Sequence, residues 1–303
     1  MVTFAGLAAA LVSCADKAAE QKTTDGQFRY LVDEFADLKI MRYNVPGWDD
    51  LSLQQKKYVY HLAEASKYGR DIIWMQNYKH NLRVRKALEA VLENYEGDRT
   101  SEDWAGFETY AKRVFFSNGI HHHYAEDKFY PECPEAYFRS LLTAVGADDA
   151  GLLEIIYSKD IAPARKVMDS NVDIVAESAV NFYDNVTRAE VEAFYAAMVD
   201  PSDKTPVSYG LNSKVVKGDD GVVKEDVYKV GGLYGNALKK ICKELKKAAR
   251  YAENETQKAY IADLIQYYKT GDLKLWDKYN VQWVKDTLGT VDFVNGFVED
   301  YND

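Results

Sequence analysis

The polar cluster best suited to chemistry runs from Ser117 to Tyr124 and includes three of the chain's five histidines, His121, His122 and His123. Neighbouring side chains point about 100° apart on a helix and to opposite faces of a strand, so consecutive histidines rarely converge on one ion. His121 and His123 share a face if the segment is a strand, but no carboxylate or thiolate is spaced to complete a zinc ligand set. We therefore predict a loop that packs against a groove, with one histidine contacting substrate, rather than a metal site.

Other charged groups with suggestive spacing are weaker candidates. His61 and Glu64 lie one helical turn apart, a ligand-like spacing, yet such a pair standing alone is more often an exposed polar pair. The run KKICKELKK, from Lys239 to Lys247, predicts one charged face of a helix with its acidic complement nearby. A Gly-rich phosphate loop, a GxSxG elbow and an HExxH zinc helix are absent from the sequence. These residues alone indicate a globular protein without naming a reaction.

Composition limits the class of protein. The 303 residues carry 38 Lys and Arg against 48 Asp and Glu, a formal net charge of -10. No basic surplus is present to neutralise phosphates, so a nucleic-acid-binding protein is not expected. A hydrophobic content of 47% with 28% charged residues is ordinary for a globular protein. No run of 18 apolar residues occurs, so the sequence predicts no membrane-spanning helix.

The first residues differ from the rest of the chain. An apolar stretch leads into LVSC, which ends at Cys14 and resembles the lipobox of bacterial lipoproteins, whose Cys becomes the lipidated first residue. The Lys or Arg usual in a signal peptide is missing, and the alternative is a short buried helix with an incidental Cys. The resemblance implies a signal peptide over residues 1–13, a tether over 14–27 and a globular part over 28–303. It also implies a protein anchored by lipid in the cell envelope, in the periplasm or at the outer membrane.

Helix signals dominate the N-terminal third. Ser52 with Gln55 three residues later forms a capping box, which opens a helix to about Lys67 before Gly69 breaks it. Amphipathic patterns predict further helices after Asn81 and from about Ser101 to Phe116. Pro134 suits the first turn of a helix that reaches Val145, and short helices are expected around Leu152 and Ala164 in a poorly patterned region.

The C-terminal half adds a small sheet to further helices. Thr187 and Glu190 form a second capping box, for a helix that continues to Pro201. Alternation over 207–217 and 222–230, around a Gly-Asp-Asp-Gly turn, predicts a β-hairpin. Later helices are predicted from Leu233 to about Glu253, from Thr256 to about Lys269, and from Asp272 to about Asp286, before an extended segment at Val291–Phe293. The predicted fold class is α+β, mostly helical, with a minor antiparallel sheet.

Four stretches stand out when they are taken together: LSLQQKKYVYHLAEASKYGRDI (51–72), FFSNGIHHHYAEDKFYP (115–131), TPVSYGLNSKVV (205–216) and VDFVNGFVEDYND (291–303). In this order and spacing they resemble the dipeptidyl peptidase III family, zinc-dependent enzymes that remove dipeptides from the free amino terminus of short peptides. The similarity covers nearly all of residues 28–303 and is greatest to the bacterial branch.

The resemblance implies a two-lobed enzyme with a wide cleft. Its first lobe, with helices around a small β-barrel, presents substrate-binding groups, and its second lobe holds zinc through HExxGH and a downstream Glu. HExxGH is absent here, so no zinc ligand or general base is assigned, and zinc is expected only in the full-length family. The family's amino-terminus clamp, Glu-x-Tyr after Gly-Phe, is matched by GFVEDY. It implies that Glu299 pairs with the peptide ammonium and that Tyr301 orients it. Asn302 stands where some family members have Arg.

We therefore predict a dipeptidyl aminopeptidase of this type, a zinc metallopeptidase represented by its peptide-binding lobe and inactive alone. The expected partners are short peptides with a free amino terminus, and the membrane only through the lipid anchor. No nucleic acid is expected. The alternative is a non-catalytic peptide-binding lipoprotein of the envelope. A weaker alternative is assembly with a separate chain that carries the zinc lobe.

Overall fold

The computed structural model describes residues 28–298, and the chain divides into two units, Met1–Leu51 and Ser52–Asp303. In the first unit, β1 (Leu31–Phe35) and β2 (Leu38–Met41) form an antiparallel hairpin whose turn holds Ala36 at φ 51°. The sequence analysis assigned no element here. Most hairpin side chains are at least partly exposed on both faces, so they leave no clear period-two apolar pattern. The expected signal peptide (1–13), Cys14 and the tether (14–27) lie outside the described residues.

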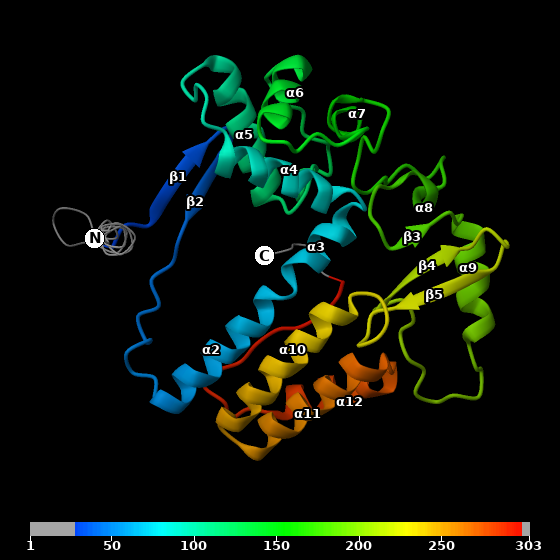
Figure 1. Cartoon of the computed structure of the whole chain (residues 1–303). Helices are drawn as coiled ribbons and strands as arrows, with labels where there is room; N and C mark the ends of the chain where they lie inside the picture. Colours follow the sequence, from blue (N-terminus) through cyan, green and yellow to red (C-terminus); the bar gives the residue numbers. More distant parts are fainter. Residues whose placement is uncertain (1–27, 299–303) are drawn as a thin grey trace, which may run out of the picture. The chain divides into compact units, whose positions relative to one another are not determined.

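The second unit contains two large hydrophobic cores. The first core lies among α3 (Arg70–Asn77), α4 (Asn81–Asn94), α5 (Glu102–Phe116), α6 (Glu135–Ala144) and α7 (Leu152–Tyr157), which Figure 1 shows gathered in one group. The side chains at its centre are fully buried and mostly aromatic or branched: Leu88, Phe107, Phe138, Leu141 and Ile156.

The second core lies among α2 (Leu53–Lys67), α10 (Gly235–Ala248), the 3-10 turn η1 (Ala249–Tyr251), α11 (Glu255–Thr270) and α12 (Leu273–Lys285). Helix α10 packs along α2, and α11 packs along α12 (Figure 1). Tyrosine is prominent among its fully buried side chains, which include Tyr58, Tyr260 and Tyr279. In the part of the chain that the structure describes, no helix is long and apolar enough to cross a bilayer.

A small mixed sheet, of strand order β3-β4-β5, completes the second unit. Strand β4 (Ser213–Lys217) pairs antiparallel with β5 (Val223–Val227), and β3 (Tyr183–Asp184) adds to β4 in parallel. Helices α8 (Ile174–Glu177) and α9 (Arg188–Met198) lie beside it, and a third, small core forms around Val186, Val191 and Val215.

The predicted fold class is confirmed: the chain is mostly helical with a small sheet. Both predicted capping boxes form, with Ser52 accepting from the backbone of Gln55 and Thr187 accepting from that of Glu190. Each satisfies backbone N–H groups that a helix start leaves without partners, which explains why these two helix starts were predicted correctly.

The predicted break at Gly69 is confirmed, since α2 ends at Lys67, but the sequence analysis omitted α3, which begins at Arg70 with Gly69 as its N-cap. Two details of the prediction are wrong. No helix forms around Ala164, which instead makes an isolated β-bridge with Asp127. The first strand of the hairpin begins at Ser213, not at residue 207, since residues 209–212 form turns. Each of these outcomes depends on distant partners rather than on local periodicity.

Candidate functional site

A cavity of about 760 Å³ opens in the second unit beside the second core, several of whose side chains line it. Helices α2, α3, α10, α11 and α12 line it, mainly with aliphatic and aromatic side chains. Its polar groups are few. Most come from the end of α3, with Gln76 and Asn77, and from the loop residues Arg165 and Lys166. A concave, largely apolar space of this size with a few polar groups is typical of a ligand site.

Residues 291–298 run along this cavity as an extended segment. Their exposure alternates, so that Phe293, Asn295 and Phe297 face the protein while Val294 and Val298 face outward. An alternation of period two is what an extended backbone produces when one face is packed. All residues from Phe293 to Val298 line the cavity.

Phe297 anchors this segment. Its ring lies 5.2 Å from that of Tyr228 and 5.5 Å from that of Tyr268, centroid to centroid, both edge to face. The side-chain amide of Gln76 donates to its carbonyl oxygen at 2.8 Å, and the hydroxyl of Tyr268 donates to the side-chain oxygen of Asn295. Aromatic packing and a backbone-directed hydrogen bond together hold this part of the segment against the cavity wall.

The beginning of the segment is fixed by two side chains near the start of α11. The carboxylate of Glu253 accepts from the backbone of Thr290 at 2.9 Å and of Val291 at 2.8 Å. Gln257, fully buried, donates to the carbonyl of Val291 at 3.0 Å. Burial raises the pKa of Glu253, but the hydrogen bonds from Val291, Gln55 and Thr290 outweigh it and hold the pKa below its usual value. The carboxylate is therefore charged at neutral pH and remains an acceptor.

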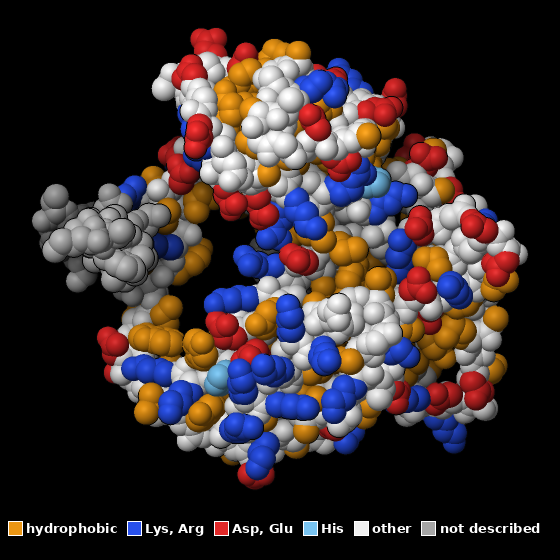
Figure 2. Space-filling view, viewed as in Figure 1, with side chains coloured by type: hydrophobic (Ala, Val, Ile, Leu, Met, Phe, Trp, Pro, Cys, Tyr) orange, Lys and Arg blue, Asp and Glu red, His pale blue; other side chains and the backbone are white. Residues whose placement is uncertain are grey.

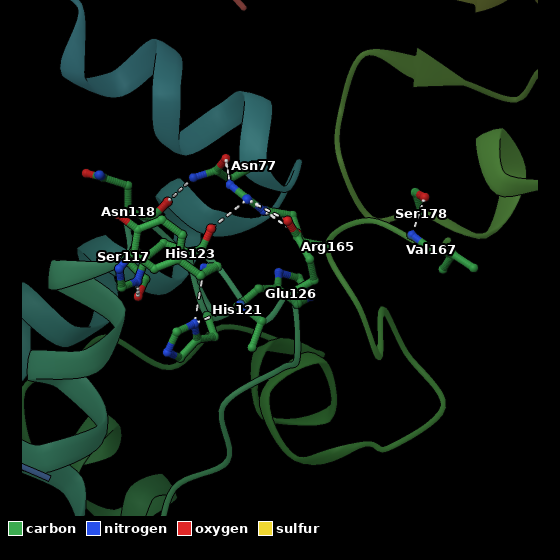
Figure 3. Close-up of polar contacts among 12 residues, drawn as sticks. Asn77, Ser117, Asn118, His121, His123, Glu126, Arg165, Val167 and Ser178 are labelled. Atoms are coloured by element: carbon green, nitrogen blue, oxygen red, sulfur yellow. Dashed lines mark hydrogen bonds and ion pairs between the residues drawn. The ribbon is translucent and has the colours of Figure 1, made fainter. Parts of the chain in front are cut away.

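A buried arginine connects the cavity to the loop that contains the histidines, residues 117–128. Arg165, 2% exposed, donates from Nε and Nη2 to the two carboxylate oxygens of Glu126, at 2.6 and 2.9 Å. It also donates to the side chain of Asn77 at 3.1 Å and to the carbonyl of His123 at 2.9 Å. Figure 3 shows these side chains pointing toward one another. This two-pronged pairing gives Arg165 a fixed orientation at the cavity wall.

The side chains of the three histidines do not converge on one point, and each has a different hydrogen-bond partner. His121 Nε2 lies 2.8 Å from the carbonyl of Ala162, His122 Nδ1 accepts from the backbone of Tyr124 at 3.1 Å, and His123 Nδ1 lies 3.3 Å from the hydroxyl of Ser117. Burial lowers the pKa of His121 to about 4, so its ring is neutral at pH 7 and serves as a buried structural contact. Whether His122 or His123 contacts substrate stays a prediction.

The described residues do not fit a zinc site. Between residues 28 and 298, no group of three or more His, Cys, Asp or Glu side chains could hold a metal ion. Of the pair with ligand-like spacing, His61 faces Glu244, with Nδ1 to Oε2 at 3.1 Å, and Glu64 pairs with Lys67. We therefore assign no metal-dependent step to these residues.

The two predicted clamp residues, Glu299 and Tyr301, lie outside the described residues, but Glu299 follows directly after Val298, which lines the cavity. The sequence analysis missed Gln76, Asn77 and Arg165. Asn77 and Arg165 are buried polar side chains whose partners, such as Glu126, are far away in the sequence. The stretch 51–72, which carries the family resemblance, ends in GRDI at the start of α3 and so stops short of Gln76 and Asn77.

The chain is similar to a known peptidase family and to several of its members. The model of "Peptidase family M49" matches residues 146–303, just over half of the chain. Dipeptidyl peptidase 3 of Homo sapiens is 23% identical over 301 residues, and that of Rattus norvegicus is 20% identical over 307. Each match covers 84% of this chain and 40% of the relative, so the chain spans well under half the length of these relatives. The solved structure of DPP III from Caldithrix abyssi matches 82% of this chain and 36% of its own, with a TM-score of 0.51 at 19% identity, which shows a shared fold.

Proposed function

Since the chain belongs to peptidase family M49, we propose that it forms the peptide-binding part of a dipeptidyl aminopeptidase of the dipeptidyl peptidase III type. Its ligands would be short peptides with a free amino terminus. The observation that supports this best is the extended segment along the cavity, which leads without interruption into GFVEDY.

The chemistry of the proposed clamp follows from the substrate. A dipeptidyl peptidase must recognise an ammonium group and measure two residues from it. The carboxylate of Glu299 would pair with the ammonium through a charge-assisted hydrogen bond, and the hydroxyl of Tyr301 would orient it. Phe297, packed against Tyr228 and Tyr268, would hold the start of the clamp in place.

The cavity wall also offers backbone groups to a peptide. Among the residues that the structure describes, the backbone N–H groups of Val294, Gly296 and Val298 donate to no other group. An extended segment with unpaired N–H and C=O groups is a template on which a peptide can add as a further strand. Such pairing reads no side chain, which suits an enzyme that acts on peptides of varied sequence.

Hydrolysis is a separate matter from binding. The sequence holds no HExxGH, and zinc, which the resemblance assigns to the full-length family, finds no fitting ligand set among residues 28–298. We propose that this chain by itself binds peptides without cleaving them, and that cleavage needs a zinc lobe, on a longer product or on a separate partner chain.

Calorimetry with two matched pentapeptides tests the proposal. The peptide with a free amino terminus should bind at least tenfold more tightly than its N-acetylated form, and Glu299→Gln should abolish the difference. Asp300→Asn removes a neighbouring carboxylate and serves as the control that keeps the preference. Equal binding of the two peptides by the unaltered chain would refute the clamp.

A further inference from the structure

The lysine-rich run of α10 forms a basic face that the proposed peptide site does not use. Six cations lie on the outward side of α10 and η1: Lys239, Lys240, Lys243, Lys246, Lys247 and Arg250. The opposite side of the helix, with Leu238, Ile241 and Leu245, is buried in the second core. Figure 2 shows blue side chains gathered over α10 and the adjoining α2. One helix therefore serves the core with one side and presents a dense positive charge with the other.

This charge is largely uncompensated. The sequence analysis expected acidic partners nearby, but on α10 the only carboxylate is that of Glu244. Its side chain is 9% exposed and already pairs with Lys247 at 2.6 Å and His61 at 3.1 Å. Lys239, Lys243 and Lys246 make no ion pair or hydrogen bond with any described residue. Although the net charge of the chain is -10, this face therefore carries several positive charges without carboxylate partners and has a positive electrostatic potential.

Helix α2 adds both charge and aromatic surface next to this face. Lys57 Nζ lies 5.4 Å from the ring centroid of Tyr251, and Lys240 Nζ lies 5.3 Å from that of Tyr68. Tyr60, 58% exposed, projects from the same helix. Lysines interleaved with exposed tyrosines combine long flexible cations with amphipathic rings, the pair of side chains found at membrane–water interfaces.

We propose that this basic face of α10 and α2 lies on an anionic lipid surface. Five of its six α10–η1 cations are lysines, which are strongly hydrated point charges without the planar fork by which arginine reads carboxylates, phosphates or bases. Protein interfaces are likewise depleted of lysine and enriched in arginine. A fluid layer of anionic headgroups needs no fixed geometry and is attracted by several adjacent lysines at once.

Vesicle sedimentation of the full chain tests this proposal. Phosphatidylcholine vesicles are compared with vesicles that also contain phosphatidylglycerol, at low and high salt. The N-terminal apolar residues are present in every sample, so the difference between the two lipids reports the basic face. Each lysine near an anionic surface contributes about fivefold to partitioning, so K239A/K243A/K246A should weaken binding to the anionic vesicles roughly 100-fold. High salt should have a similar effect.

The control variant K159A/K204A/K224A removes the same charge from exposed lysines elsewhere in the second unit. It should change binding only a few-fold, and circular dichroism should show that both variants are folded. Equal losses in the two variants would mean a general effect of net charge and would overturn the proposal. So would equal binding to both lipids, or tighter binding to a short DNA duplex that depends on the same three lysines.

Discussion

At the scale of single residues, Arg165 determines how the cavity wall meets the histidine-containing loop. Its guanidinium is buried and bound to Glu126, Asn77 and the carbonyl of His123. Removing one partner of a buried ion pair leaves the other charge without compensation, which costs more than the pair itself contributes. Arg165 is not part of the proposed clamp, but it stabilises the cavity wall next to it.

We expect Arg165→Gln to lower the free energy of unfolding by about 3 kcal/mol, measured by urea denaturation. Arg188→Gln is the matched control, since Arg188 also pairs with a glutamate, Glu192, but both side chains are about 60% exposed. That change should cost less than about 0.5 kcal/mol, because exposed pairs contribute little. Similar losses in the two variants would show that burial of the Arg165 pair has no special weight.

Residue-level prediction from sequence succeeded where chemistry is local and failed where it is not. The histidines were expected to belong to a loop rather than to converge, and each indeed has a separate polar partner. Arg165 gave no signal, because nothing within one helical turn marks it. Its partner Glu126 lies 39 positions away.

At the scale of elements, the course of the segment 290–298 depends on Glu253, just before α11, and on Gln257 of α11, which hold its first residues. Glu253→Ala removes the acceptor for the backbone of Thr290 and Val291. Each lost hydrogen bond costs about 1 kcal/mol. We expect hydrogen exchange of the Thr290 and Val291 amides to accelerate roughly tenfold, while exchange in α11 stays unchanged.

The control for that experiment is Glu255→Ala, which removes a 90% exposed carboxylate two residues further on. It should leave exchange of the Thr290 and Val291 amides unaltered. If Glu253→Ala also leaves it unaltered, Phe297 and Gln257 hold the segment without help from Glu253, and the peptide-binding wall is more rigid than we propose.

The elements themselves were predictable to the degree that their ends carry local signals. Helices α2 and α9 begin at capping boxes and α12 at Asp272, and all three were predicted close to their observed bounds. The two-residue strand β3 was not, because it exists only by pairing with β4, about thirty residues later. The same holds for the site. Its apolar walls come from helices that were predicted from sequence, whereas α3, which supplies Gln76 and Asn77, was seen only in the structure.

At the scale of the whole molecule, charge is divided by region rather than spread evenly. The net charge of -10 excluded nucleic acid as an expected partner, yet the average concealed the basic face of α10. A composition is a sum over all surfaces, so it limits long-range attraction but says nothing about one side. This is why the sequence analysis treated the lysine run as a charged helix face with its acidic complement nearby.

Two membrane contributions, one proposed from sequence and one from structure, can be separated in cells. We propose that Cys14 carries lipid, an attachment through buried acyl chains that salt does not screen, whereas attraction of the basic face to anionic headgroups is screened. In a bacterial host, Cys14→Ser should leave the protein on membranes only at low salt, and K239A/K243A/K246A should leave it there at both salt concentrations. Combining the changes should release it entirely, as measured by fractionation and immunoblotting. Salt-resistant attachment that survives Cys14→Ser would refute the lipid anchor, while the basic face would still be judged by its salt-sensitive part.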